Sequence, residues 1–486
     1  MSTTDNHGPG MVSHLYRIRP LNALLDKHHE LERQEIFFAE PTQLNDPMEG
    51  LRDVFWQGDR IVWTNLLRHY LKCLNRAWMF WNVAAEQEDL TWRHIPVLQF
   101  TDDPPQLREL DQQISEAFFA KRVVIAFIQA LSQRTLPVRR QELVAHLRYL
   151  HILAITTVHS VYRKRHPKHV APLKGAAPRK ITEAIGQLET LVLGVEKLAT
   201  GQPDDDHSLD AFFSGHNLVV DQLNLIHHYN GDVDPGLKNK NFLFLEFPIG
   251  YVDQLIQLVY PPWYAACFLE TCSNSSVWGH YGEGHTGVAL KFKAKAVQGR
   301  PALRLNRICG LNSAGLFSAD VDHLFEPVRY GPPAVEIDFF RSLGRLPVVK
   351  LRSDWFMDAA GNRSPCSDEM FRSEEDWRKR HWERFHQSIT GKSSDWEYER
   401  EYRLVLSGEL DFSEPQSRKA KYDFNDLEGI VFGIRTPAEA KRAIAKIVEQ
   451  KCRATGRTDF RFYQAFYSSR DARIEHAEMR LLKFAN

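Results

Sequence analysis

The densest run of ionisable residues in the sequence is the segment 397–403, which contains Glu397, Glu399, Glu401 and Arg403 at alternate positions. In a strand, alternate residues share one face, so this spacing would place three carboxylates and Arg403 in a row. Carboxylates that close destabilise one another unless a cation intervenes or one takes up a proton. Two interpretations stay open. The row is a charged strand edge that resists pairing, or a carboxylate pair that acts as a base or stabilises positive charge on a sugar carbon.

An aromatic group lies earlier in the chain, where Trp278, His280 and Tyr281 are close neighbours. Aromatic rings can stack on a flat ligand, and a histidine can bond to ribose or phosphate oxygens. The same residues could instead be core aromatics with a hydrogen-bonded histidine. The group therefore predicts either a ligand platform or a part of the core.

Two further patterns carry less weight. Gly282, Gly284 and Gly287 have the spacing of a dinucleotide-binding loop, but β-like residues follow them in place of the helix that such a loop needs. Two cysteines and two histidines also follow one another, but too few residues separate the pairs for a zinc finger, and a buried structural cysteine is favoured. We therefore expect no metal. These residues are Cys267, Cys272, His280 and His285.

The surrounding segments have to position these residues. Alternating or short apolar runs predict strands, and apolar residues at helical spacing predict helices. The run that contains Asn45, Asp46 and Pro47 predicts a structured turn. Strands are expected at 13–18, 35–39, 242–247, 265–269, 288–292, 401–406, 429–432 and about 460–466, and helices at 21–32, at 438–450 and after 466.

The middle of the chain differs, because no glycine stands between Gly58 and Gly175 and helical spacing dominates. The simplest organisation is a mixed α/β core made from residues 1–58 and 240–486 and split by an all-α insertion at 59–239. Insertion at a loop is tolerated because the cost of loop closure grows slowly with length. A charged, Trp-rich loop-helix insertion is expected at 353–395. Helices of the large insertion are expected at about 61–86, 106–133, 139–164, 179–199 and 208–228.

The composition limits the classes of protein to which the chain can belong. The chain has 486 residues, of which 43% are hydrophobic, so a disordered chain is excluded. Lys plus Arg and Asp plus Glu each number 62, which argues against a dedicated nucleic-acid or anionic-membrane coat. Six dispersed cysteines fit a reduced compartment. Neither a signal peptide nor a membrane span is expected, so the chain is predicted to be cytoplasmic, without a membrane partner.

The order of several motifs resembles a widespread bacterial family of unknown function. The resemblance covers about 1–58 and 260–450, which leaves the helical insertion and the tail outside it. The motifs are Leu15-Tyr16-Arg17, Ile36-Phe37-Phe38, Leu44-Asn45-Asp46-Pro47 with Glu49, Val277-Trp278-Gly279-His280-Tyr281, His285 with Gly287, Trp396 with Glu399-Arg400-Glu401-Tyr402-Arg403, and Ile430-Val431-Phe432-Gly433.

A second similarity is to the ADP-ribosyltransferases, which carry a basic residue on the first strand, an aromatic or hydroxyl residue in the middle, and a late glutamate, often as E-x-E. Arg17, Tyr281 and Glu401 stand in that order, with Glu399 as the first residue of E-x-E. The chain departs from the pattern because it lacks a Ser-Thr-Ser segment, and His14 is an alternative to Arg17.

The second resemblance implies an α+β fold with a mainly antiparallel sheet, and an enzyme of bacterial conflict or phage defence that cleaves NAD at the nicotinamide–ribose bond. Glu401, Glu399 and Tyr281 would be catalytic, and the acceptor would be a protein or a nucleic acid. Residues expected to bind NAD are Arg17, Tyr16, Trp278, His280, Asn45 and Asp46.

Two other functions stay open. One is a non-catalytic nucleotide-binding or sensing module whose helical insertion docks a partner. The other is a nucleic-acid-processing enzyme that uses His280, His285 and the carboxylates, against which the zero net charge counts.

Overall fold

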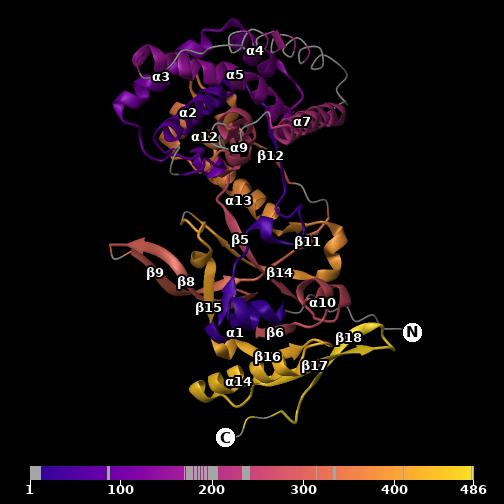
Figure 1. Ribbon diagram of the computed structural model, residues 1–486. Helices are drawn as coiled ribbons and strands as arrows, with labels where there is room; N and C mark the ends of the chain where they lie inside the picture. The colour runs from indigo at the N-terminus through magenta and orange to yellow at the C-terminus, as the bar shows by residue number, and fades with distance from the viewer. Residues whose placement is uncertain are drawn as a thin grey trace, which may run out of the picture. The chain divides into compact units, whose positions relative to one another are not determined.

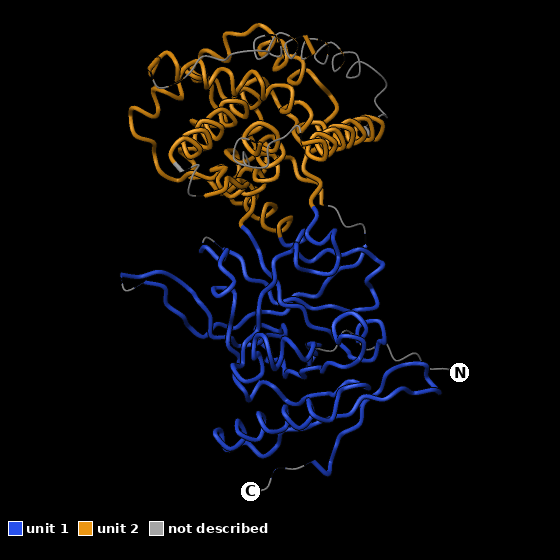
Figure 2. Tube along the Cα trace, viewed as in Figure 1, with its two compact units in different colours: residues 1–51, 262–334, 386–486 blue, residues 52–261, 335–385 orange. Residues whose placement is uncertain are grey.

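The computed structural model describes residues 12–84, 88–168, 206–231, 241–313, 315–331, 335–408 and 410–482, together with a few single positions. The chain forms two compact units, which Figure 2 distinguishes by colour. Unit 1 consists of residues 1–51, 262–334 and 386–486, and unit 2 consists of residues 52–261 and 335–385. Unit 2 therefore takes in 52–58, 240–261 and 335–385 in addition to the insertion expected at 59–239.

Unit 1 is built on a sheet of eight described strands, and all but one of its pairings are antiparallel. The expected mixed, mainly antiparallel architecture is therefore confirmed. The exception is the parallel pair β16–β17, which the helix α14 (Ala438–Thr455) connects. In order across the sheet, the strands are β10 (Glu326–Pro327), β14 (Glu401–Ser407), β5 (Trp263–Leu269), β1 (His14–Arg19), β6 (Val288–Lys293), β16 (Leu427–Phe432), β17 (Arg461–Ser468) and β18 (Arg473–Glu478).

Both faces of this sheet are covered. On one face Leu15, Phe268 and Ile430 pack with Ile444 and Val448 of α14 in the main core. Residues of the short helices η1 (Asn22–Lys27) and α1 (Glu30–Arg33) join the same core. On the other face a smaller core includes Trp278 of α10 (Ser275–Tyr281). Because hydrophobic burial is the main favourable term in folding, these two cores fix where the ends of the strands lie.

A second sheet of unit 1 has the order β2-β15-β8-β7, and β9 pairs with β8. The strands β8 (Arg300–Asn312) and β9 (Gly315–Leu324) form a long hairpin that extends beyond the rest of the sheet (Figure 1). Our sequence analysis did not predict this hairpin, although apolar residues alternate at Leu303 and Leu305 and at Phe317, Ala319 and Val321. The other members are β2 (Glu35–Phe37), β7 (Lys295–Val297) and β15 (Lys419–Tyr422).

Unit 2 is mainly helical and also carries a sheet of order β12-β3-β4. Within the described segments, every helix is too short or too polar to cross a bilayer. The long helices are α2 (Arg60–Ala84), α3 (Pro105–Phe119), α4 (Arg122–Gln133), α5 (Arg140–Arg165) and α7 (Asp206–Tyr229), and the strands are β3 (Arg52–Trp56), β4 (Val138–Arg139) and β12 (Val335–Asp338).

Most predicted elements are confirmed within a few residues, and four are corrected. The single helix expected at 21–32 is interrupted by left-handed His29 and forms η1 and the short α1. The strand expected at 242–247 is wrong, because the segment forms the π-helix η5 (Phe242–Glu246), which continues into α9 (Phe247–Gln254). A continuous apolar run does not separate a buried strand from a buried helix by its periodicity. The helix expected after 466 is replaced by β18, and the helix at 106–133 is two helices. The helix expected at 179–199 lies outside the described residues.

Gly287 ends the loop after α10. It directly precedes β6 and packs against Arg19 at the end of β1. A methyl group there would lie 2.4 Å from the carbonyl oxygen of Arg19 and 3.1 Å from Cα of Gly282, and neither backbone atom can yield easily. We expect Gly287→Ala to lower the free energy of unfolding by about 1–3 kcal/mol, as overpacking does. Urea unfolding followed by circular dichroism measures the change. Gly279→Ala is the matched control, because nothing lies within 4 Å of the added methyl group. Equal unfolding midpoints for both variants would contradict the prediction.

Candidate functional site

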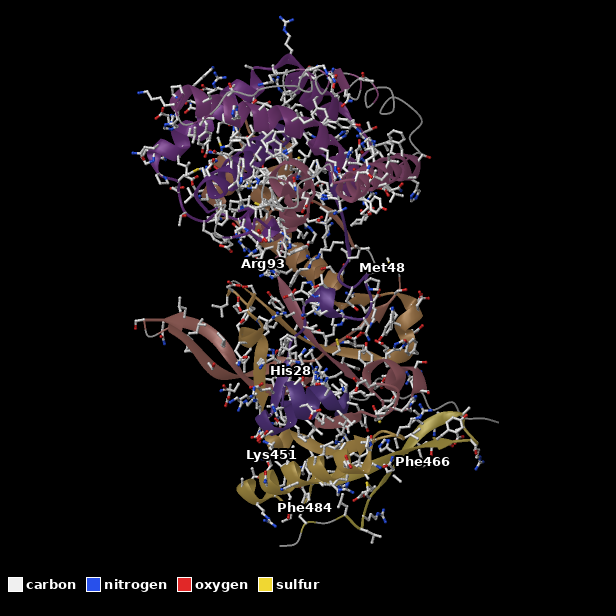
Figure 3. All side chains as sticks on the ribbon, viewed as in Figure 1. His28, Met48, Arg93, Lys451, Phe466 and Phe484 are labelled. Carbon is white, nitrogen blue, oxygen red and sulfur yellow. The ribbon has the colours of Figure 1, made fainter. Side chains whose placement is uncertain are left out.

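A cavity of about 180 Å³ in unit 1 gathers residues that the sequence spreads over the whole chain. A single water needs only about 10–15 Å³, so the cavity is large enough for a small organic group. The turn 44–50 forms part of its wall, and the labelled Met48 marks this turn in Figure 3. The lining residues that matter here are Arg17, Asn45, Glu49, Cys267, Tyr281, Lys392 and Glu401.

The cavity lies where two neighbouring strands diverge. The strands β1 and β5 pair at one position only, Tyr16 with Leu269. Further along β5, Ala39 takes the place of β1 by bridging to Ala265. Residues of β1, of β5 and of the segment around Ala39 therefore all reach the cavity wall.

Arg17 spans this divergence. Its Nη1 donates to the carbonyl oxygen of Cys267 at 3.3 Å, and its Nη2 donates to that of Phe37 at 3.1 Å. Burial, with a smaller contribution from Arg19, lowers the pKa of Arg17 to about 10, so the guanidinium stays charged at neutral pH. Among the described residues, no carboxylate forms an ion pair with Arg17 at the cavity. A buried guanidinium without an acidic partner is suited to binding an anion.

Lys392 is the centre of a buried carboxylate cluster. Its Nζ lies 2.7 Å from Oε2 of Glu399, 2.8 Å from Oε2 of Glu401 and 3.6 Å from Oε2 of Glu49. The lysine belongs to β13 (Gly391–Lys392), and its ammonium group also lies 4.9 Å from the ring centroid of Trp396. The close approach of three carboxylates is tolerated because this cation stands among them.

Arg403 is the second cation of the cluster. Its Nε donates to Oε1 of Glu401 at 2.8 Å, its Nη2 donates to Glu49, and its Nη1 donates to the carbonyl oxygen of Ile389 at 2.8 Å. Both oxygens of Glu401 thus face a cation. The backbone N–H of Glu401 donates to the hydroxyl of Tyr330 at 2.7 Å, which further fixes the start of β14.

The neighbours move the pKa values of the two E-x-E glutamates in opposite directions. Burial opposes ionisation of Glu401, but Arg403 and Lys392 outweigh it and lower the pKa of this carboxyl to about 2. Burial raises the pKa of Glu399 above its ordinary value, and Lys392 compensates only in part. Two adjacent carboxyl groups with separated pKa values can take different roles, one remaining ionised and the other carrying a proton.

Tyr281 joins the cluster through Glu399. Its hydroxyl donates to Oε1 of Glu399 at 3.0 Å. Burial and the adjacent Glu399 raise the pKa of this phenol well above its ordinary value, so the hydroxyl keeps its proton. The ring also packs against the smaller core that contains Trp278.

The backbone of the E-x-E segment is not the continuous strand that the sequence suggested. Residues Ser394–Glu399 form the 3₁₀-helix η9, Arg400 is left-handed with φ 47°, and β14 begins at Glu401. The expected row of Glu397, Glu399, Glu401 and Arg403 on one strand face is therefore wrong, and Glu397 is exposed. The intervening cation Arg403 was expected, but Lys392 was not.

Of the remaining residues that the sequence predicted for the site, some line the cavity and others do not. Asn45 lines the cavity, whereas Asp46 is buried beneath the turn and its Oδ1 accepts from the N–H of Met48 at 2.9 Å. Tyr16 and Trp278 belong to the smaller core and do not line the cavity. His280 is exposed, with its ring centroid 5.9 Å from that of Trp396.

Lys392 and Tyr330 are the contributors that our sequence analysis missed. Each stands alone in sequence among unrelated residues, and the parallel pairing of Tyr330 with Lys392 between β11 (Arg329–Tyr330) and β13 brings them together. A lone lysine gives no spacing signal. Among the described residues, no three Cys, His, Asp or Glu side chains are grouped so that they could hold a metal ion.

Comparison of the chain with family models, curated proteins and solved structures finds no match. The site therefore has to be interpreted from its own geometry.

The low pKa of Glu401 predicts how stability depends on pH. Its ordinary value is 4.5 and its value in the fold is about 2, so ionised Glu401 stabilises the protein above pH 4.5, and this contribution disappears as the pH falls toward 2. We expect Glu401→Gln to lower the free energy of unfolding at pH 7 by about 3–5 kcal/mol, because it leaves buried cations without their partner. The difference from wild type should shrink steadily between pH 4.5 and pH 2.

Urea unfolding at a series of pH values measures this effect. Glu397→Gln, in the exposed glutamate of the same segment, should match the wild type throughout. A Glu401→Gln deficit of the same size at pH 7 and at pH 2 would show that the ion pairs do not stabilise the fold.

Proposed function

We propose that the cavity of unit 1 binds the nicotinamide–ribose end of NAD and that the chain is an ADP-ribosyltransferase-like enzyme. The observation that carries the proposal is that Arg17, Tyr281 and Glu401 line one cavity although the sequence separates them widely. The fold supports it as well, because this cavity lies at a divergence between two strands of a mainly antiparallel sheet. The resemblance to the bacterial family with the same motif order is part of the same proposal.

Each residue has a role in the proposed reaction. The planar fork of Arg17 binds a phosphate or ribose oxygen. Tyr281 stacks against the nicotinamide ring and holds Glu399 through its hydroxyl. Glu401, which stays ionised at neutral pH, stabilises the positive charge that develops on the ribose.

The chemistry balances without a metal or a redox step. The bond between ribose C1′ and the nicotinamide nitrogen breaks, and both electrons pass to the nitrogen, so that neutral nicotinamide leaves. The acceptor, which is water or a nucleophilic group of a protein or nucleic acid, forms a bond to C1′ and loses a proton. That proton passes to solvent, because Glu399 does not line the cavity and its two carboxyl oxygens already accept hydrogen bonds from Tyr281 and Lys392. Glu399 acts instead by holding these two side chains in position.

A second function is favoured by one observation. Both oxygens of Glu401 already accept hydrogen bonds from Lys392 and Arg403. A carboxylate that is fully occupied by cations is less available to a ribose. This favours the alternative of a nucleotide-binding module without turnover, in which the cluster only holds the walls of the cavity.

The release of nicotinamide from NAD separates the two functions. Glu401→Asp keeps the negative charge but withdraws it by one methylene, so we expect kcat/KM for nicotinamide release to fall at least about 100-fold, the size of effect found when one transition-state contact is removed. Tyr281→Phe should lower the rate less, because the ring remains. Calorimetry with NAD shows whether binding survives in each variant.

The control is Glu397→Asp, which makes the same change at an exposed position of the same segment and should leave the rate unchanged. Circular dichroism verifies that each variant is folded. A normal rate of nicotinamide release in folded Glu401→Asp would remove the catalytic role of Glu401. Binding of NAD without any release by the wild type favours the module, and no binding at all removes both functions.

A further inference from the structure

Unit 2 contains a second and larger cavity, of about 740 Å³, which the function proposed for unit 1 does not use. This volume lies in the range of sites for small organic ligands, about 300–1,000 Å³. The helices α2, α3 and α4 and the segment 346–359 form its wall. All of these belong to unit 2, so the cavity is complete within that unit.

The helix α2 faces the cavity with a polar stripe. Arg60, Thr64, Arg68 and Lys72 recur every four residues and all line the cavity. Residues four apart lie above one another on a helix, so the stripe is continuous. Elsewhere on its circumference α2 packs into the core through fully buried residues such as Trp63 and Leu74. The stripe therefore places three cations along one wall.

The cations of α2 differ in their partners along the helix. Lys72 lies 2.7 Å from Asp103, and Arg76, one turn further on, pairs with Asp103 at 3.2 Å and with Asp111 at 2.6 Å. Among the described residues, no carboxylate pairs with Arg60 or Arg68 at the other end. Arg68 donates to Oδ1 of Asn65 at 2.5 Å, and the nearest acidic influence on it is the charge of Asp354, with which it forms no ion pair. Ion pairs with carboxylates therefore form at the Lys72 end of the stripe and, among the described residues, not at the Arg60 end.

The facing helix α3 adds another free cation. Arg108 lines the cavity and has no ion pair with any carboxylate in the described part of the chain. The lining carboxylates that lack an ion pair are Glu116 and Asp354, which accept hydrogen bonds from Gln112 at 2.9 Å and from Ser353 at 2.6 Å. The lining as a whole holds five cations and five carboxylates, so its positive character is local, at the three guanidiniums that form no ion pair with a described carboxylate.

An apolar wall lies beside these arginines. Phe119, Ile125, Ile128 and Leu346 line the same cavity, and Ile125 remains 40% exposed. The guanidinium carbon of Arg68 lies 5.8 Å from the ring centroid of Phe119, so the cationic and apolar parts of the wall are adjacent. Apolar lining with a few convergent charged groups is the usual construction of a site for an organic anion.

We propose that this cavity binds an organic phosphate, with its phosphate groups on Arg60, Arg68 and Arg108 and its flat or apolar body against Phe119 and Ile125. One guanidinium group can donate two parallel hydrogen bonds to a phosphate group. Arginine is therefore better suited than lysine to bind phosphate at these three positions. The ligand is a second one, distinct from a nucleotide in unit 1.

Isothermal titration calorimetry of the full chain with ATP and with inorganic pyrophosphate tests the proposal. We expect ATP to bind more tightly than pyrophosphate, because only ATP has a body for the apolar wall. The double variant Arg68→Gln/Arg108→Gln should weaken ATP binding at least 10-fold, and Phe119→Ala should weaken the binding of ATP but not that of pyrophosphate.

Two control variants fix the place of binding. Arg122→Gln removes an exposed arginine of α4 that does not line the cavity, and Tyr281→Ala removes the ring from the cavity of unit 1, so both should bind ATP as the wild type does. Absence of ATP binding, unchanged affinity in the arginine double variant, or equal affinity for ATP and pyrophosphate would each overturn the proposal. Loss of ATP binding in Tyr281→Ala would assign the nucleotide to unit 1 and would overturn the proposal as well.

Discussion

The candidate site depends on keeping Lys392 and Arg403 charged in the interior of unit 1. Removing an ammonium or a guanidinium group from water costs several kcal/mol per ion unless close counter-charges compensate. The chain meets this cost with Glu49, Glu399 and Glu401, which come from a turn, a 3₁₀-helix and a strand. Lys392 and Arg403 together hold the turn and the strand through Glu49 and Glu401, and Lys392 alone holds the 3₁₀-helix through Glu399. This part of the cavity wall and its electrostatics follow from one requirement, that Lys392 and Arg403 are buried together with counter-charges, whereas Arg17 on the same cavity has no such ion pair with a described residue.

Much of unit 1 could be predicted from the sequence, because strand signals are local. The alternation in 13–18 and the short apolar runs at 265–269, 288–292 and 429–432 correspond to β1, β5, β6 and β16. The strand prediction failed where the local pattern is ambiguous. Phe242–Phe247 is apolar except for Glu246, so its period carries little information, and the structure has a helix there that buries Phe242, Leu243 and Phe247.

The chemistry was less predictable than the strands. The sequence identifies Glu399 and Glu401 as a pair, but not the cation between them, because Lys392 follows a helix and is seven residues from Glu399. It also cannot indicate that Arg400 adopts a left-handed backbone, which ends η9 and turns both glutamates toward the lysine. Charge balance is a property of the folded arrangement, and spacing rules that assume one strand overlook it.

The way in which the chain alternates between the two units has a consequence for how the protein is made. Arg17 bonds to the carbonyl group of Cys267, and 250 residues separate them. At a synthesis rate of about 5–20 residues per second, roughly 12–50 seconds pass between the emergence of β1 and that of β5. During this time β1 has neither of its neighbours in the sheet, while the first segment of unit 2 is already complete. The nascent chain thus contains a strand without partners, with Leu15 and Ile18 still unburied, during the synthesis of the helical segment, and such a strand has to be kept from pairing with other chains.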